Sequence, residues 1–394
     1  MSASGQNHAG SPAAVAAVLF ACLFTAQAAV IALSPVLPAV AADLHVSTAG
    51  AGQLRTVLGL AAGITALGVG RAAGRLSLRA LLLVGVGLLA AGSAASAAAP
   101  SFAVLAVAQV VIGSGVAIVV AAGSAAAAEW TAPEHRARVL SWALMGQPAS
   151  WIIGMPLVGV LGGTSWRLGW IVLPLLAAAV ATVAVATRPA AAAASVIPQR
   201  ARDVLADPGV RGWALCELLA NSGWAGTLVY VGALCADVHG ASSLAVGFVL
   251  AAGAAAFVAG NLTFRRFVGT DVRAKLIGLS PAMALGVLLL GTVRETLALS
   301  AAVFAAASFV AGGRVLLGSA YGLELAPERR LAVMGIRAAA TQFGYFAGTA
   351  IAGAALAAYG WSGFGVAAAL LLATSPLPLI AVGGLRLRPA TVSV

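Results

Sequence analysis

Residues 101–125 read SFAVLAVAQVVIGSGVAIVVAAGSA and contain no charged side chain. A helix that crosses the roughly 30 Å hydrocarbon layer of a bilayer needs about 20 apolar residues, so this run is long enough to span it. The rest of the chain has the same character: 61% of its 394 residues are hydrophobic, 8% are charged, and the mean hydropathy is +1.03. A soluble domain usually carries about a quarter charged residues. The sequence therefore predicts a protein that lies almost entirely within a membrane.

Apolar runs separated by charged residues, Pro or Gly predict twelve membrane-spanning helices in two sets of six. The first set is expected at residues 13–37, 49–69, 78–98, 101–125, 139–162 and 168–187. The second set is expected at residues 211–234, 244–263, 275–292, 297–321, 333–357 and 362–383. Between them, residues 188–210 contain three prolines and several charged residues, which is typical of an exposed linker. The predicted fold is all-α, with six-helix bundles at residues 1–187 and 211–394.

The positions of the basic residues predict how the chain is oriented. Most of them fall in loops on the side of the membrane that holds the N-terminus, whereas the opposite loops contain only Arg167 and Arg294. The positive-inside rule then places both termini and the linker in the cytoplasm, which requires an even number of crossings. The net charge of +11 is thus explained by topology, because it forms no surface stripe of the kind that binds nucleic acid. The Ala-, Gly- and Arg-rich composition is typical of a high-GC bacterium and indicates the inner or plasma membrane.

Two other features have simple interpretations. Ala26-Gln27-Ala28 resembles a signal cleavage site, but no Lys or Arg precedes the apolar run, so we interpret it as part of a retained first helix. The three cysteines, Cys22, Cys216 and Cys235, lie in apolar runs without the spacing of a metal site or a disulfide framework. We interpret them as packing residues, and the sequence predicts no metal or cofactor.

An internal repeat supports the twelve-helix count independently. Ala42-Asp43-Leu44-His45 recurs as Ala236-Asp237-Val238-His239, and Pro133-Glu134-His135-Arg136 recurs as Pro327-Glu328-Arg329-Arg330, both after 194 residues. The same displacement relates three further pairs, which are Arg71 and Arg265, Arg79 and Arg273, and Gly154 and Gly348. Five shared offsets indicate a duplication. Because each copy has six crossings, the two copies have the same orientation, and in such proteins the solute site lies between the halves.

The basic loops, the repeated Pro-Glu-x-Arg and the glycine-rich fifth helix resemble the major facilitator superfamily over nearly the whole chain. Within it, the chain looks most like the twelve-helix drug and metabolite exporters that work as proton antiporters. Residues 33–44, LSPVLPAVAADL, are similar to the exit of their first helix. Gly154-Met155-Pro156, followed by Gly159 and Gly163, resembles their fifth-helix antiporter motif. The resemblance implies export by alternating access in exchange for protons.

Small residues on the fifth and eleventh helices, including Gly344, Gly348 and Ala352 on the latter, favour a seam on which the halves slide; simple helix packing is the alternative. Two departures from the family pattern weaken two expectations, namely an acidic latch after the second helix and proton coupling through an arginine on the fourth helix. The loop after the second helix keeps Arg71 and Arg75 but lacks the family's acidic residue. Gln109 stands where the fourth helix of the family carries an arginine.

Charged residues inside a span are costly and therefore candidates for function. Glu217, Arg314 and Arg337 are expected at similar depths in helices 7, 10 and 11. An acid flanked by arginines is suited to a protonation switch, so Glu217 is the predicted proton site. The alternatives are an ion pair that only holds helices together, or a Glu217 side chain that reaches the membrane surface.

Uncharged polar and aromatic residues on the helices that line the cavity in the family are the predicted solute contacts, with interhelical hydrogen bonding as the alternative. They are Gln27, Gln109, Asn221, Trp224, Tyr230, Gln147, Trp151, Gln342 and Tyr345.

Charged residues in the loops after helices 4 and 10 are the predicted conformational clasps. They are Glu129, Glu134, Arg136, Glu324, Glu328 and Arg330. Arg55, near the start of the second helix, is expected to reach the lipid headgroups, with attraction of an anionic solute as the alternative.

The sequence contains no GxSxG, HExxH or Walker A pattern, so we predict neither an enzyme nor a pump driven by ATP. The predicted function is secondary transport, namely proton-coupled export of a small amphipathic or hydrophobic compound. The predicted partners are this small molecule, protons and the lipid bilayer, without an obligate protein partner. One alternative is a uniporter or sugar-type exporter without proton coupling. An alternative of another class is a transporter-like membrane receptor or scaffold, which the short loops disfavour.

Overall fold

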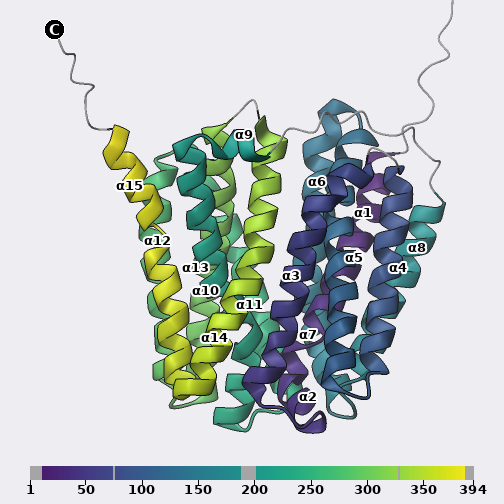
Figure 1. The fold of residues 1–394 in the computed structure, drawn as a ribbon, viewed down its shortest axis with the longest axis vertical. Coiled ribbons are helices and arrows are strands. Elements are labelled where there is room, and N and C mark those ends of the chain that lie inside the picture. The colour runs from purple at the N-terminus through teal and green to yellow at the C-terminus, as the bar shows by residue number, and fades with distance from the viewer. Residues whose placement is uncertain (1–10, 74–75, 188–200, 327–328, 387–394) are drawn as a thin grey trace, which may run out of the picture. The chain divides into compact units, whose positions relative to one another are not determined.

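The computed structural model describes residues 11–73, 76–187, 201–326 and 329–386, and almost all of these are helical (Figure 1). The chain forms two compact units. The first unit comprises residues 1–197 and 240–251, and the second comprises residues 198–239 and 252–394. Helical structure follows from the environment that the sequence predicts, because in lipid every backbone N–H and C=O must find its partner within the protein.

The first unit contains the helices that precede the predicted linker. They are α1 (Pro12–Ile31), η1 (Ser34–Val36), α2 (Leu37–Asp43), α3 (Thr48–Ala73), α4 (Leu78–Ala97), α5 (Phe102–Glu129), η2 (Pro133–His135), α6 (Arg136–Leu144), α7 (Gly146–Gly162) and α8 (Leu168–Ala186). The elements α1, η1 and α2 together make one bent crossing, since Pro35 and Pro38 lack the N–H that a continuous helix needs. Within this unit, α5 packs against α3 and α4, and α1 packs against α7 and α8.

The remaining helices follow the predicted linker. They are α9 (Ala201–Leu205), α10 (Pro208–His239), α11 (Ser243–Phe264), η3 (Arg265–Phe267), α12 (Val272–Thr292), α13 (Leu297–Leu325), α14 (Arg330–Thr374) and α15 (Leu377–Arg386). The start of α11 belongs to the first unit and the rest of α11 to the second. Within the second unit, α10 packs against α13, α14 and α15, and α12 packs against α13 and α14.

The described residues are consistent with twelve crossings. Ten helical segments are long and apolar enough to span a bilayer. The 26-residue helix α3 adds another, since it is about 39 Å long at 1.5 Å per residue. The 45-residue helix α14 contains two crossings, because Gly360 breaks it with φ 64° and ψ −161°. The predicted all-α membrane architecture with twelve crossings agrees with these helices.

The helix boundaries also follow the internal repeat. Helices α11, α12 and α13 begin at Ser243, Val272 and Leu297, which is 194 or 195 residues after the starts of α3, α4 and α5. Three consecutive helices of each half therefore share one register, as a duplication requires.

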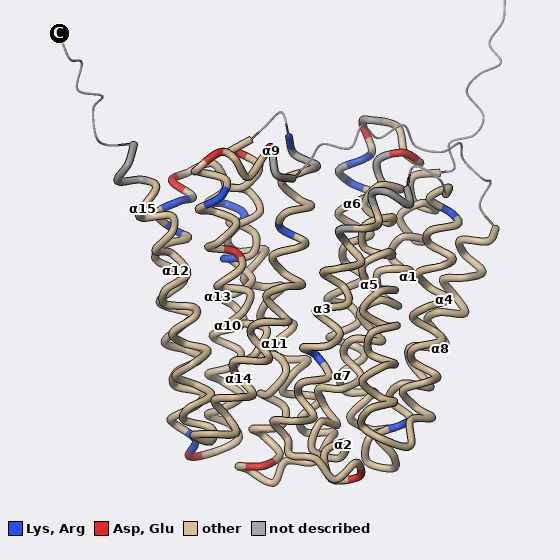
Figure 2. The backbone as a smooth tube through the Cα atoms, in the orientation of Figure 1, with Lys and Arg blue, Asp and Glu red and all other residues tan. Residues whose placement is uncertain are grey.

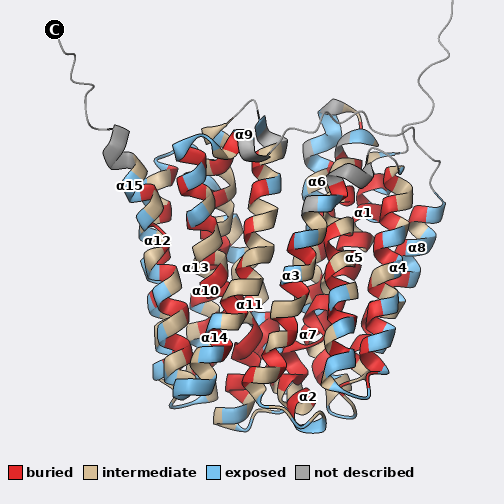
Figure 3. Ribbon diagram, viewed as in Figure 1, coloured by how far each residue is buried: buried red, intermediate tan, exposed pale blue. Residues whose placement is uncertain are grey.

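Charge and burial agree with a membrane environment. Basic and acidic residues gather mainly at the helix ends in both units (Figure 2), and buried residues face the neighbouring helices (Figure 3). Large apolar side chains also lie on outward faces: Leu176, Val180 and Val183 on α8 are 64%, 55% and 64% exposed. Their i, i+4, i+7 spacing puts them on one side of the helix, which is the side expected to contact lipid.

The small residues of α14 pack inside the second unit. A Cβ atom on Gly344 would lie 2.7 Å from Cβ of Asn221, and one on Gly348 would collide with the carbonyl oxygen of Ser222. Both neighbours belong to α10. The predicted seam between the halves is therefore wrong for Gly344 and Gly348. The sequence shows that one face of this helix carries small residues, but not which neighbouring helix packs against that face.

We expect Gly348→Val to destabilise the protein strongly, because the added side chain meets backbone of α10 that has no free space. The exposed helical position Gly278 is the matched control, since a Cβ there meets nothing within 4 Å. The melting temperature in detergent should fall for Gly348→Val and change little for Gly278→Val. Equal melting temperatures for the two variants would contradict the close α10–α14 contact.

Candidate functional site

Three charged side chains meet inside the second unit. Glu217 lies about 14 Å along α10 from its first residue, at 1.5 Å per residue, and its side chain has no exposed surface. Nη1 of Arg314, on α13, lies 3.1 Å from Oε1 of Glu217. Nε of Arg337, on α14, lies 3.5 Å from Oε2 of the same carboxylate. The structure thus brings together the three residues that the sequence singled out, and it contradicts the alternative in which Glu217 reaches the membrane surface.

Arg314 is held firmly by uncharged groups around it. Its Nε donates to Oγ of Ser280 at 3.3 Å, and its Nη2 lies 3.3 Å from both the carbonyl oxygen and Sγ of Cys216. The guanidinium is only 2% exposed. Sequence reasoning missed Ser280 and the contact of Cys216, although Cys216 directly precedes Glu217 in the chain.

The two arginines differ in how tightly they are held. Arg337 is 20% exposed and donates from Nη2 to the carbonyl oxygen of Val315 at 3.2 Å. Among the described residues, Nε of Arg337 and Oε2 of Glu217 form an ion pair but have no hydrogen-bond partner. A separation of 3.5 Å is longer than an ordinary N–H···O hydrogen bond. Arg337 is therefore the weaker and more accessible partner of the carboxylate.

A glycine makes room for the carboxylate. A Cβ atom on Gly318, one turn after Arg314 on α13, would lie 2.5 Å from Oε1 of Glu217. Any larger residue at this position would displace the carboxylate from Arg314. The arrangement of Arg314 and Gly318 on one helical face thus provides both the charge and the space that Glu217 needs.

The solute-contact candidates of α10 lie close to this cluster in sequence but are occupied by other contacts. Asn221 donates to the backbone carbonyl of Glu217 at 2.7 Å, one turn back on the same helix. The ring of Trp224, 8% exposed, stacks on Phe304 at 6.0 Å between centroids. Tyr230 is fully buried, and its hydroxyl lies 3.5 Å from the carbonyl oxygen of Thr349. Tyr230 therefore contributes mainly to packing, whereas Asn221 and Trp224 stay candidates.

The other candidates divide between the units. Gln109 on α5 is buried, and its side-chain amide donates to Oγ of Ser96 on α4 at 3.0 Å, which favours its structural alternative. The remaining candidates are half-buried: Gln27 on α1, Gln147 and Trp151 on α7, and Gln342 and Tyr345 on α14.

Comparison with known proteins gives the family. The model of the Major Facilitator Superfamily matches residues 19–319, which is more than half of the chain. The chain belongs to this superfamily. No curated protein sequence matches the chain significantly.

Solved structures of superfamily members resemble it closely in fold. A bacterial homologue of the human lysosomal transporter Spinster, in an inward-facing and unoccupied conformation, has a TM-score of 0.74 at 13% identity and covers 97% of this chain and 96% of its own. The human organic anion transporter MFSD10 has a TM-score of 0.70 at 17% identity, with coverage of 94% and 100%. A mutant of the nucleoside transporter NupG has a TM-score of 0.74 at 12% identity, with coverage of 93% and 99%. Identities this low show the fold alone.

The residues of the superfamily's fifth-helix motif lie on α7. A Cβ atom on Gly154 would lie 2.5 Å from Cδ1 of Ile31 on α1, and one on Gly159 would collide with the carbonyl oxygen of Ser243 at the start of α11. Pro156 lies inside α7, and Gly163 is its C-cap. Close contacts surround Gly154 and Gly159, and a role of this motif in conformational change stays a prediction.

The predicted loop clasps are placed only in part. Arg136 donates from Nε to the carbonyl oxygen of Thr131 at 3.2 Å, while Glu129, Glu134 and Glu324 are exposed. Arg71 lies in the last turn of α3 and Arg330 is the first residue of α14, but the structure describes the side chain of neither. Arg75 and Glu328 lie outside the described residues. The clasp function stays a prediction.

Arg55 is buried and does not reach the headgroups. Its side chain is 2% exposed, and Nη1 donates to the carbonyl oxygen of Val30 on α1 at 3.2 Å. The predicted snorkelling is wrong because the buried guanidinium bonds to the backbone of α1, and sequence gives the depth of a residue in a span but not the direction in which it points.

The sequence did not predict an ion pair in the first unit between Arg167 and Asp43. Arg167, before α8, lies 2.7 Å from Oδ2 of Asp43 at the end of α2 and donates to the carbonyl oxygen of Ala99 at 3.0 Å. Its guanidinium also stacks on the ring of Trp166, whose Nε1 donates to the same oxygen of Asp43 at 3.0 Å. The only signal in the sequence was that Arg167 is one of two arginines in the loops on this side.

We expect Arg167→Ala to lower the stability of the first unit by about 1 to 2 kcal/mol, since it removes a partly exposed ion pair and a charged hydrogen bond. Arg294→Ala is the control, because Arg294 makes one long hydrogen bond of 3.4 Å to Ser362. Thermal unfolding of the purified protein should show a larger loss for Arg167→Ala. A smaller loss than that of the control would show that the contact contributes nothing.

Proposed function

We propose that this protein is a proton-coupled secondary transporter that exports a small amphipathic compound, and that Glu217 carries the proton. The observation that carries the proposal is a carboxylate with no exposed surface, placed inside a membrane-spanning bundle between two arginines. Acidic residues are rare at such positions because burying a charge is costly, and they usually take part in ion or proton movement. The alternating-access mechanism and the direction of export come from the resemblance to the antiporter branch.

The cluster has the properties of a switch between two protonation states. Two guanidiniums lie against one carboxylate, so movement of either arginine changes the charge balance at Glu217. Arg314 is fixed by Ser280 and Cys216, so it stays with Glu217. Arg337 has the longer contact and the more exposed side chain, so its withdrawal requires the least rearrangement. Withdrawal of Arg337 would leave the carboxylate with Arg314 as its single counter-charge, and in the proposed cycle this is the state that takes up the proton.

The charge of the cluster bears on the kind of solute. One carboxylate faces two guanidiniums, so the cluster carries a net positive charge whether Glu217 is ionised or protonated. Coulomb repulsion in a medium of low dielectric constant disfavours a cation at this depth. We therefore propose an amphipathic compound that carries no positive charge, contacted by Asn221 and Trp224. The similar structures are named for different cargoes, so the fold itself selects none of them.

A second candidate is uniport or sugar-type export without proton coupling. The observation that favours it is the firm anchoring of Arg314, because a fixed ion pair also serves simply to hold α10 against α13. In that case the charge of Glu217 would never change during transport.

The test uses purified protein in proteoliposomes with an imposed pH gradient and a panel of neutral antibiotics, lipophilic cations and sugars. Uptake or release of a neutral compound should follow the pH gradient in the wild type and become independent of it in Glu217→Gln. Glu295→Gln, at an exposed position between α12 and α13, should behave as the wild type. Gradient-dependent flux that persists in Glu217→Gln would sink the proposal and favour uniport. Absence of flux for every compound, with binding retained, would favour the receptor alternative.

Glu217→Gln leaves two arginines without a counter-charge, and such changes often destabilise a protein by several kcal/mol. The double variant Glu217→Gln/Arg337→Gln removes one charge of each sign and keeps the net charge of the cluster. It should fold and transport without dependence on pH. Retained pH dependence in this double variant would likewise contradict proton transfer at Glu217.

A further inference from the structure

A layer of apolar side chains lies one helical turn from the charged cluster, toward the end of the second unit that carries α9. On α10, Trp213 precedes Glu217 by four residues, on α12 Leu276 precedes Ser280 by four, and on α14 Val333 precedes Arg337 by four. These three helices begin at the same end of the unit. On α13, which runs the opposite way, Leu317 follows Arg314 by three residues.

The layer is continuous and dry. Trp213, Leu276, Leu317 and Val333 have no exposed surface and belong to one buried cluster. Val204 on α9 and Leu379 on α15, 1% and 2% exposed, belong to the same cluster. Six helices thus each contribute at least one apolar side chain to it. Water does not enter a close-packed apolar region of this kind.

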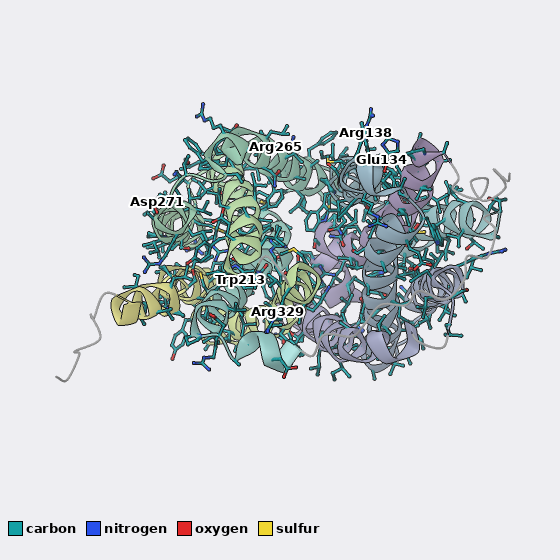
Figure 4. The ribbon with its side chains drawn as sticks, turned by 90° about the horizontal axis from the view of Figure 1, so that it is seen from above. Glu134, Arg138, Trp213, Arg265, Asp271 and Arg329 are labelled. Carbon is teal, nitrogen blue, oxygen red and sulfur yellow. The ribbon has the colours of Figure 1, made fainter. Side chains whose placement is uncertain are left out.

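Trp213 is the largest member of the layer and fills the space between α10 and α13. Seen along the helices, it lies among the helices of the second unit, whereas Asp271 lies at the rim (Figure 4). Its Nε1 donates to the carbonyl oxygen of Gly318 at 2.8 Å, and a Cβ atom on Gly322 would collide with its ring. Gly318 also borders the carboxylate of Glu217. The indole therefore packs on the α9 side of the proposed proton site. It also contacts the segment of α13 that faces Glu217.

The exposed surface of the charged cluster lies on Arg337. Glu217 and Arg314 are 0% and 2% exposed, whereas Arg337 is 20% exposed. The groups that face Glu217 are Arg314 from α13 and Arg337 from α14, together with the uncharged Cys216 and Ser280 nearby. Arg337 is thus the charged member of the cluster with the largest exposed fraction.

We propose that Trp213 is a positioning residue that seals Glu217 from the α9 end of the second unit, so that protons reach the carboxylate only past Arg337. The inference rests on the proposed function, since it concerns the route of the proton that Glu217 binds. In this route a proton from water forms an O–H bond on the carboxylate, and no other bond changes. The seal would prevent the protein from conducting protons when no solute is moved.

The test measures proton leak into substrate-free proteoliposomes with an internal pH-sensitive dye, after a potassium diffusion potential is imposed. Proteoliposomes with the wild-type protein should have a low proton leak rate. Trp213→Ala should raise this rate severalfold, because water then reaches the carboxylate from the α9 end. In Trp213→Ala/Glu217→Gln the leak should be lost, which a purely structural role of the tryptophan would not produce. Trp142→Ala removes a 61% exposed tryptophan from α6 and is the control, which should stay tight.

The outcomes separate this inference from the proposed function. A folded Trp213→Ala variant with an unchanged proton leak rate overturns the proposal that Trp213 seals Glu217, even if Glu217→Gln abolishes pH-dependent flux. A leak that is unchanged in the double variant overturns the route through Glu217. Because loss of a buried tryptophan leaves a large cavity, Trp213→Leu serves if the alanine variant does not fold. It should leak less than the alanine variant but more than the wild type, and a tight Trp213→Leu would also overturn the seal.

Discussion

The contact between Glu217 and Arg314 constrains the whole second unit. A carboxylate with no exposed surface is stable in a bundle only if opposite charge and hydrogen-bond donors surround it. Arg314 provides the charge, and Ser280 and Cys216 fix the guanidinium so that it stays in place. The absence of a side chain at Gly318 lets the carboxylate and α13 approach each other. Changing any one of these groups would leave a buried charge without its partner.

Close helix contacts through small residues fix the relative positions of the helices that carry the charged residues. In a membrane, helices gain little by burying apolar surface against each other, so close van der Waals contact and hydrogen bonds decide how they pack. The α10–α14 crossing at Gly344 and Gly348 holds the helix of Arg337 close to the helix of Glu217. The positions of two helices thus depend on glycines that lie two to three turns away from the charged groups.

The sequence was sufficient for those properties that follow from periodicity along one helix. Hydropathy and the internal repeat gave the twelve crossings, and the rise per residue put Glu217 and Arg314 at one depth. Properties that depend on which helix faces which were not predictable. Arg55 was expected in the headgroups but is covered by α1, and Gly348 was expected at a sliding seam but contacts α10. The contact of Asp43 with Arg167 joins residues 124 apart in the chain, and nothing in their local sequence indicates it.

The solitary position of Glu217 limits how much work the transporter can do. The other acidic residues that the structure describes lie in loops or within three residues of a helix end. If Glu217 carries the proton, one proton moves per cycle, and each 100 mV of membrane potential supplies about 2.3 kcal/mol. For a neutral compound this corresponds to a concentration ratio of about fiftyfold across the membrane. With a single buried carboxylate among its described residues, the protein is thus suited to keeping the cellular level of a compound low, and a steeper gradient at the same proton-motive force would require a second titrating group.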